Sequence, residues 1–269
     1  MFEWLITIPV PFENVSLWAI VVVALAHGFG CFVRGAFGFG SNMPIVAATT
    51  FILGPHHAIL LALMTSMVAQ AHLLPQGYRT ADWQIAKQLI VGLIFGTGFG
   101  VWLFAILSAE KLVLILGILI SIIILMDTFK VVEHVSRFIE FRLRWMTIGF
   151  SFIGGTIGGI SGAGAFYFLV VYLKHACQFP DVLRGTTVML STITMIMRFA
   201  ILSISGFISL TVILEGLLLA PMVLLATWLG SQTFRNSSAE KFYQGLQVLL
   251  LSGGAALIYK GIQDFGLVR

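Results

Sequence analysis

The sequence predicts an all-α polytopic membrane protein built from two inverted repeats of five apolar segments each. Hydrophobic residues make up 59% of the 269 residues, charged residues make up only 10%, and the mean hydropathy is +1.02. A soluble domain carries about a quarter of its residues as charged side chains, so a chain of this composition needs a surface that faces lipid. The spacing of the apolar runs and the recurrence of short motifs supply the rest of the prediction.

Apolar runs, separated at charged residues, prolines and glycines, divide the chain into ten segments. A helix needs about 20 residues to cross roughly 30 Å of hydrocarbon. We expect eight long helices, at residues 15–36, 58–74, 83–107, 111–127, 145–160, 185–205, 208–233 and 241–260. The remaining segments, 41–53 and 163–173, are too short to span, and each directly follows a glycine-rich interruption. We expect both to be short helices packed inside the protein, where broken backbone is tolerated.

The two glycine-rich interruptions, residues 35–44 and 158–165, occupy matching places in the two halves of the chain. Glycine suits a position where a helix breaks and shows its backbone to a ligand. Paired interrupted segments of this kind mark the binding site of many secondary transporters. The sequence therefore indicates a membrane transport protein with its binding site at the two breaks.

The second half of the chain repeats the first. Gly38 corresponds to Gly162 and Gly100 to Gly230, at offsets of 124 and 130 residues, and Ser66 corresponds to Ser191. The four residues Ser-Ala-Glu-Lys occur at both 108–111 and 238–241, at equivalent segment junctions. Because each half has an odd number of segments, two fully spanning halves must be inverted in the membrane.

The distribution of Lys and Arg supports the inverted arrangement. With the N-terminus outside and ten crossings, three basic residues lie outside, namely Lys111, Lys260 and Arg269. Ten lie inside, namely Arg79, Lys87, Lys130, Arg137, Arg142, Arg144, Lys174, Arg184, Arg235 and Lys241. If each glycine-broken pair formed one crossing, the repeats would be parallel, and the split would be eight to five. The excess of positive charge on the cytoplasmic side favours the first arrangement.

We therefore divide the chain into an N-terminal transmembrane repeat (1–127), a cytoplasmic connector (128–144) and a C-terminal transmembrane repeat (145–269). The connector holds four basic and two acidic residues. We expect the connector to be a solvated linker. Because its basic residues contribute to the net charge of +4, this charge does not indicate nucleic-acid binding. The sequence predicts no metal site or cofactor, because Cys31 and Cys177 are far apart and no metal-ligand spacing is present.

Two arginines, Arg34 and Arg198, lie within apolar segments, and neither has an acidic residue near it in sequence. Arginine at mid-bilayer costs at least about 2.5–3.5 kcal/mol, so such a residue normally faces a cavity or a partner. A guanidinium beside glycine-rich backbone suits an oxyanion, to which it donates two parallel hydrogen bonds. The alternative is a structural arginine that bonds to carbonyls or extends to the membrane interface. Of the two, Arg34 is the stronger candidate for ligand contact.

The breaks themselves offer further donors to an anion, through free N–H groups at helix N-termini and through hydroxyl and amide side chains. The predicted substrate-binding residues are Arg34, Gly38, Gly40, Ser41, Asn42, Ser161, Gly162, Gly164 and Arg198. Polar residues at helical spacing in two other segments line a pathway or bond across helices, and these are Ser66, Gln70, Ser191 and Thr194. For each of these four taken alone, helix packing is the favoured interpretation.

His27, His72 and Glu215 are candidates for proton coupling, because each lies in an apolar segment and titrates. The competing interpretation places Glu215 at the membrane interface and gives the histidines routine hydrogen bonds. It is favoured for Glu215 and His72, whereas His27 stays open because it precedes Arg34 by about two turns. His56 and His57 follow Pro55 and are expected in a surface loop.

An alternative of another class comes from Gly159–Gly162, which is similar to the GxSG motif of rhomboid-type intramembrane serine proteases. A serine nucleophile needs a base within reach, and the only histidine downstream of Ser161 is His175, in a charged loop. The repeat also explains these glycines, so the protease is much less favoured. An anion channel is the nearer alternative to a carrier.

The segment order, Gly38-Phe39-Gly40 with Pro44, Ser161-Gly162-Ala163-Gly164 and the repeated Ser-Ala-Glu-Lys together resemble the sulfite exporter TauE/SafE family, also called toluene sulfonate uptake permeases. The resemblance extends from about Leu17 to Ile262. It implies a multi-pass secondary transporter of the bacterial inner membrane, without a cofactor, that moves sulfite, sulfonate, sulfoacetate or thiosulfate, often outward. Family members often have a longer glycine run and a proline after the second break, which this chain lacks. The particular anion, its direction, the coupling ion and a homo-oligomeric state stay open.

Overall fold

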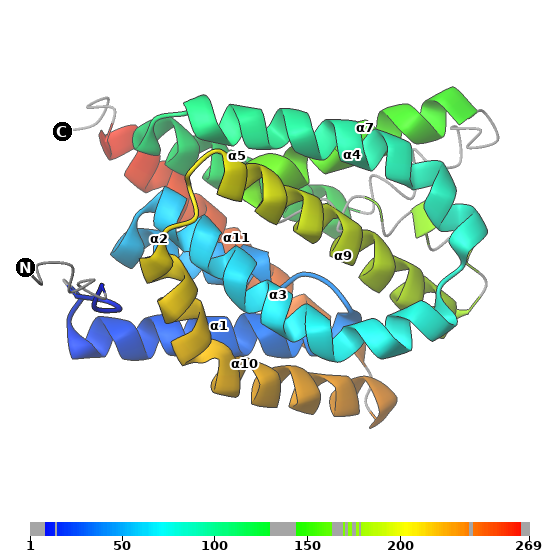
Figure 1. The fold of residues 1–269 in the computed structure, drawn as a ribbon, viewed down its shortest axis with the longest axis horizontal. Helices are drawn as coiled ribbons and strands as arrows, with labels where there is room; N and C mark the ends of the chain where they lie inside the picture. Colours follow the sequence, from blue (N-terminus) through cyan, green and yellow to red (C-terminus); the bar gives the residue numbers. More distant parts are fainter. Residues whose placement is uncertain are drawn as a thin grey trace, which may run out of the picture.

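The computed structural model describes residues 9–13, 15–129, 144–162, 179–236 and 239–264, together with residues 169, 172, 173, 176 and 177. This part of the chain contains nine α-helices and no strand (Figure 1). The helices are α1 (Leu17–Phe37), α2 (Asn42–Leu53), α3 (Pro55–Thr80), α4 (Trp83–Ile106), α5 (Ala109–Thr128), α7 (Arg144–Ser161), α9 (Pro180–Ile204), α10 (Leu210–Asn236) and α11 (Ala239–Asp264).

The predicted fold class is confirmed: the protein is an all-α polytopic membrane protein. Six of the described helices, α1, α3, α4, α5, α9 and α10, have the length and the apolar composition that a membrane crossing requires. All eight expected long helices are present, and the first short segment is the 12-residue helix α2. Most of the second short segment, 163–173, and most of the expected connector, 128–144, lie outside the described residues.

Helices α3 and α9 begin three and five residues earlier than the prediction, at 55 instead of 58 and at 180 instead of 185, and both differences change the place of a charged or polar residue. Helix α9 begins at Pro180, which suits the first turn of a helix because its missing N–H needs no partner there. Arg184 is therefore a buried helical residue, 5% exposed, and its assignment to a cytoplasmic loop is wrong. Helix α3 begins at Pro55, so His56 and His57 are half-buried helical residues, and their assignment to a surface loop is also wrong.

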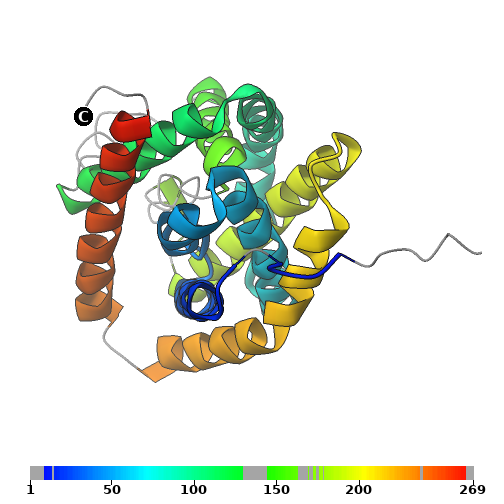
Figure 2. The same cartoon turned by 90° about the vertical axis from the view of Figure 1, so that its left-hand side faces the viewer.

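The closest helix contacts join one half of the sequence to the other. Helix α1 packs on α10, and α4 packs on α7. A Cβ atom on Gly35 of α1 would overlap the carbonyl oxygen of Thr227 in α10, and one on Gly96 of α4 would overlap that of Phe152 in α7. Glycine is thus required for these backbones to approach. The four-residue spacing of Gly92, Gly96 and Gly100 in the sequence predicts close helix contact of this kind. Figure 2 shows α10 and α11 along two sides of α1 and α2.

The contacts of the described helices are compatible with a two-fold relation between the halves, which stays a prediction. Helix α3 crosses its equivalent α9, and α5 packs on its equivalent α11. In both pairs the helices are antiparallel: Gln70 contacts Val188 while Gly185 meets Thr80, and Gly117 meets Ile258 while Gly261 meets Leu114. Equivalent helices of inverted repeats run in opposite directions, so these contacts agree with the inverted arrangement. Its orientation across a membrane and the division into 1–127 and 145–269 stay predictions.

Candidate functional site

The two glycine-rich breaks, one from each half, meet in space. The side-chain Nδ2 of Asn42, the first residue of α2, donates a hydrogen bond of 2.5 Å to the carbonyl oxygen of Gly162 at the end of α7. Gly38, Gly40 and Gly162 have φ angles of +82°, +92° and +66°, a region that residues with a Cβ rarely adopt. The glycines therefore end α1 and α7 at one place, where the sequence predicted the binding site.

Arg34, near the end of α1, is buried and bonds to neutral polar groups. Its Nε donates to Ser41 Oγ at 2.7 Å, and its Nη1 donates to Gln70 Oε1 of α3 at 2.6 Å. Nη1 also lies 3.7 Å from the sulfur of Met195 on α9. Gln70 in turn donates to the carbonyl of Val188 at 2.7 Å, so that Arg34 connects α1 to both α3 and α9. These bonds connect the first break to α3 and α9, and ligand contact by Arg34 stays a prediction.

Ser41, Asn42 and Ser66 complete this polar cluster. Ser41 Oγ donates to Asn42 Oδ1 at 2.8 Å, the hydroxyls of Ser41 and Ser66 lie 2.8 Å apart, and Ser66 also donates to Asn42 Oδ1. All three side chains are buried. At about 1.5 Å per residue, Ser66 lies about 16 Å from the first residue of α3 and about 21 Å from its last. The cluster is therefore near the middle of a helix that is long enough to cross a membrane.

Arg198 of α9 differs from Arg34 because much of its hydrogen-bonding capacity is unused. The residue is 3% exposed, and within the described part of the chain its Nε and Nη2 have no hydrogen-bond partner. No carboxylate among the described residues pairs with it. A Cβ atom on Gly162 would overlap Nη1 of Arg198 and would lie 3.2 Å from Asn42 Nδ2, so the guanidinium is directly at the second break. The Phe104 ring lies on its other side, 5.9 Å from the guanidinium carbon.

Ser191 carries a second unused polar group on the same face of α9, seven residues before Arg198. Its Oγ is buried and has no partner among the described residues. Thr194, in contrast, donates back to the carbonyls of Leu190 and Ser191 at 3.1 and 3.0 Å, as expected for a residue that packs within a helix. A buried donor that is left unpaired costs about 1–3 kcal/mol, so Arg198 and Ser191 are the described residues of this site with capacity left to bind a polar group.

The remaining predicted site residues are less informative. Ser161 Oγ donates back to the carbonyl of Ile157 at 2.7 Å, a bond within α7 that does not activate a nucleophile. Gly164 lies outside the described residues, as does His175, the base that the protease alternative would need. Among the residues that the structure describes, no three or more His, Cys, Asp or Glu side chains are grouped as they would be to hold a metal ion.

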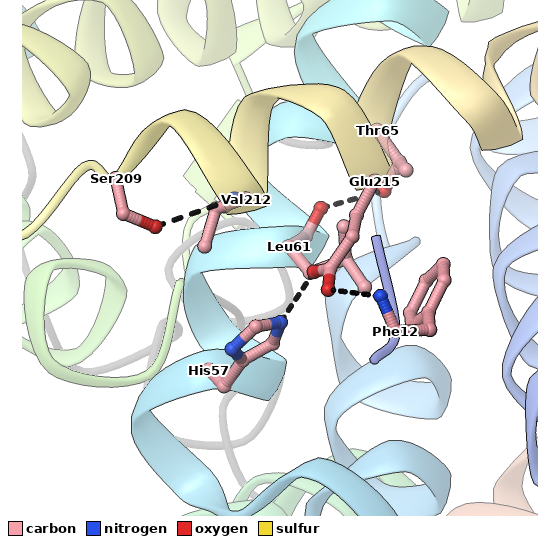
Figure 3. Close-up of polar contacts among 7 residues, drawn as sticks. All are labelled: Phe12, His57, Leu61, Thr65, Ser209, Val212 and Glu215. Atoms are coloured by element: carbon pink, nitrogen blue, oxygen red, sulfur yellow. Dashed lines mark hydrogen bonds and ion pairs between the residues drawn. The ribbon is translucent and has the colours of Figure 1, made fainter. Parts of the chain in front are cut away.

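Glu215 of α10 forms a second polar cluster toward the beginning of α3 (Figure 3). It is 2% exposed and is therefore buried within the protein. Its Oε2 lies 2.5 Å from Nε2 of His57, and its Oε1 accepts a hydrogen bond of 3.1 Å from the backbone N–H of Phe12. His57 is the functional candidate that the sequence did not indicate. Its partner is 158 residues away, and no local motif predicts such a pair.

The two other histidines proposed for proton coupling have different surroundings. His27 of α1 is fully buried, and its Nδ1 lies 2.8 Å from Thr65 Oγ1 on α3. Because the Thr65 hydroxyl donates to the carbonyls of Leu61 and Ala62, it accepts from His27 Nδ1–H. This leaves Nε2 of His27 as an acceptor with no partner among the described residues. His72 is exposed on α3.

Comparison with known proteins gives one match. A family model described as "Sulfite exporter TauE/SafE" matches residues 22–257, which includes both breaks, both arginines and all nine described helices except the first residues of α1 and the last of α11. No curated protein and no solved structure matches the chain.

Proposed function

The chain belongs to the sulfite exporter TauE/SafE family and is a multi-pass membrane transporter, and we propose that it carries small sulfur-containing oxyanions out across a bacterial inner membrane by alternating access. The anions of this class are sulfite, sulfonates, sulfoacetate and thiosulfate. The observation that carries the proposal is the guanidinium of Arg198, buried where the two breaks meet, with two N–H donors unpaired among the described residues.

A sulfur oxyanion matches the chemistry around Arg198. Its oxygens lie close enough together to accept two parallel hydrogen bonds from one guanidinium. Its negative charge would compensate a buried cation that otherwise costs several kcal/mol. The Ser191 hydroxyl on the same helix face and the N–H groups at the start of α2 would add neutral donors. In this arrangement Arg34 orients the break, and Arg198 holds the ligand.

The packing suggests which parts move. Because glycine contacts join α1 to α10 and α4 to α7, each rigid unit contains helices from both halves of the sequence. We propose that α1, α2, α3 and α10 move against α4, α7 and α9, with the α3–α9 crossing as the sliding surface. The binding site lies between these two units, so their relative motion would expose it to each side in turn. A channel would instead show flux that does not saturate with anion concentration.

The pair of buried Glu215 and half-buried His57 is the proposed site of proton coupling. One proton shared by the pair leaves it without net charge, whereas loss of that proton leaves a buried carboxylate without compensation, a costly state. A change in the number of protons on the pair would therefore change its stability in this buried place, which is what coupling of transport to protons requires.

Thermal unfolding of the purified, detergent-solubilised protein with a panel of anions tests the proposed substrate class. A ligand that binds only the folded protein stabilises it by about 2.7 kcal/mol at a concentration 100 times its Kd. We expect concentration-dependent stabilisation by sulfite or a sulfonate and none by matched potassium chloride. Stabilisation by cationic or neutral solutes alone would contradict the proposal.

Transport by protein in liposomes with an imposed proton gradient tests the coupling. Glu215→Gln is expected to remove the dependence of anion flux on the gradient while stabilisation by the anion persists. Glu13→Gln, which changes an exposed carboxylate next to Phe12, is the matched control and should keep that dependence. Proton-driven flux in the Glu215→Gln protein would contradict coupling through this pair, without bearing on the anion site.

A further inference from the structure

One face of α9 connects the proposed anion site to the first turn of the helix. Arg184, Val188, Ser191, Met195 and Arg198 follow one another at intervals of three or four residues, so they share one side of the helix. At about 1.5 Å per residue, Arg184 and Arg198 are about 21 Å apart along the axis. Arg184 is among the residues that line a small open hollow between α3 and α9. Its lining includes Gln76 and Gly77 of α3 and Asp181, Arg184 and Val188 of α9.

Arg184 and Val188 separate this hollow from the polar cluster at the break. The Val188 side chain lies against two glycines, since a Cβ on Gly77 would be 2.5 Å from its Cγ1 and a Cβ on Gly38 would be 3.3 Å from its Cγ2. A Cβ on Gly38 would also be 2.9 Å from Cγ of Arg184. At this point α9 therefore packs on glycines of α1 and α3, and we call this contact the seal. Because glycine has no side chain, the helices can separate here without moving a side chain of α1 or α3 out of a pocket in α9.

Hydrogen bonds of Arg184 hold this seal closed. Its Nη2 donates to the carbonyl oxygen of Gly35 in the last turn of α1 at 2.7 Å, and its Nη1 donates to Oε1 of Gln76 at 2.9 Å. Both acceptors belong to the unit of α1, α3 and α10, whereas Arg184 belongs to the opposite unit. These bonds must therefore break when the two units separate at this end.

An alternative partner for Arg184 is present in the same hollow. Asp181 lies three residues earlier on α9, one helical turn away, and lines the hollow together with Arg184. Residues three apart on a helix are neighbours, so the guanidinium can reach this carboxylate by a change of side-chain conformation alone. On opening, an ion pair with Asp181 would replace two bonds to neutral acceptors. Arg184 therefore has two alternative sets of partners within reach, as a two-state gate requires.

We propose that Arg184 is the gating residue between the hollow and the anion site, closed on Gly35 and Gln76 and open on Asp181. Its role in transport rests on the proposed function, but the gate itself can be tested without any substrate. In the predicted orientation the hollow faces the cytoplasm, and Arg184 controls access of the anion from that side.

The test is the labelling rate of a cysteine placed at Ser191, behind the gate, with a small water-soluble methanethiosulfonate reagent and no added anion. We expect slow labelling in Ser191→Cys, because Ser191 is 1% exposed. Adding Arg184→Met should raise the rate by about tenfold or more, since one net hydrogen bond is worth on the order of a factor of ten in an opening equilibrium. Adding Asp181→Asn should lower the rate, because the open state loses its partner.

Three comparisons keep the outcome decisive. The parent chain measures any reaction of the buried Cys31 and Cys177. Arg79→Met removes an exposed arginine in the last turn of α3 at the same end and should leave the rate unchanged. Equal rates in the Arg184→Met and Asp181→Asn proteins, or an equal rise with Arg79→Met, would overturn the proposal. A higher labelling rate in the Arg184→Met protein together with a lower rate in the Asp181→Asn protein would support the gate. If these shifts occur but no anion stabilises the protein or is transported by it, the gate is supported and the proposed substrate class is contradicted.

Discussion

Replacement of Arg198 by methionine gives opposite results for a ligand-binding arginine and for a structural one. In the anion-free protein the Arg198 guanidinium is buried, and its Nε and Nη2 have no partner among the described residues. Even a buried ion pair can often be exchanged for apolar side chains of similar volume with no loss of stability or a gain of about 1–4 kcal/mol, and Arg198 has no partner carboxylate among the described residues. We therefore expect the anion-free Arg198→Met protein to be at least as stable as the wild type. A structural arginine would instead give a loss of stability.

The effect on anion binding follows from the two donors that the variant lacks. Hydrogen bonds to charged groups contribute about 1.5–3 kcal/mol each, or about 3–6 kcal/mol for the pair. Since about 1.4 kcal/mol corresponds to a factor of ten, the affinity for sulfite or a sulfonate should fall by about 10² to 10⁴. Arg198→Lys keeps the positive charge but lacks the planar guanidinium that donates two parallel hydrogen bonds. Its affinity for the anion should therefore lie between those of the wild type and of Arg198→Met.

Thermal unfolding over a concentration series of the anion, for the wild type and both variants, measures the two effects together. The expected pattern is an unchanged or raised midpoint without anion and a lost response to anion in Arg198→Met. Arg79→Met controls for a general loss of positive charge. An affinity of Arg198→Met within about threefold of the wild type would refute the reasoning, and so would marked destabilisation without anion.

Three further predictions use the same unfolding measurement. Arg34→Met should lose about 3 kcal/mol of stability with or without anion, because it removes two charged hydrogen-bond donors from buried acceptors; a loss seen only with anion would assign ligand binding to Arg34. Ser191→Ala should weaken anion affinity by about fivefold, for one net neutral hydrogen bond of about 1 kcal/mol, without changing anion-free stability; reduced anion-free stability would show a partner for its hydroxyl. Gly35→Ala should destabilise the protein severely, because the new Cβ would overlap the backbone of α10. Gly149→Ala is the control, because its Cβ would meet open space, and it should be neutral or stabilising by about 1 kcal/mol. Equal effects of the two substitutions on stability would contradict the close α1–α10 packing.

Features that depend on local sequence were predictable. Glycine tolerates the positive φ that ends α1 at Gly38, so the place of the first break could be read from the sequence. The glycine spacing in α4 likewise predicted close helix contact, because a flat helix face is a local property. The short length of α2 followed from the same breaks. The repeat indicated that both breaks belong to one site, and the bond between Asn42 and Gly162 joins them.

Features that depend on distant partners were not predictable. The sequence favoured Arg34 over Arg198 as the ligand-binding arginine, and that choice stays a prediction. The sequence did not indicate that Arg34 bonds to Gln70, 36 residues away, and contacts Met195, 161 residues away. Which buried arginine keeps unused donors is decided by such contacts and by nothing near it in the chain. Arg184 was placed in a loop for a similar reason: its acceptor on Gly35 is 149 residues away. Burial of a charge is a property of the tertiary structure.

The contact between α1 and α10 also sets an order of events during synthesis. Gly35 precedes its partner Thr227 by 192 residues, so the close contact of Gly35 with α10 can form only when almost the whole chain has been made. At roughly 5–20 residues per second this interval is about 10–40 s. Contacts of α1 with α2 and α3 can form earlier, since Gly30 faces Ile45 and Arg34 bonds to Gln70. The packing of α1 is therefore completed last on the side that faces α10.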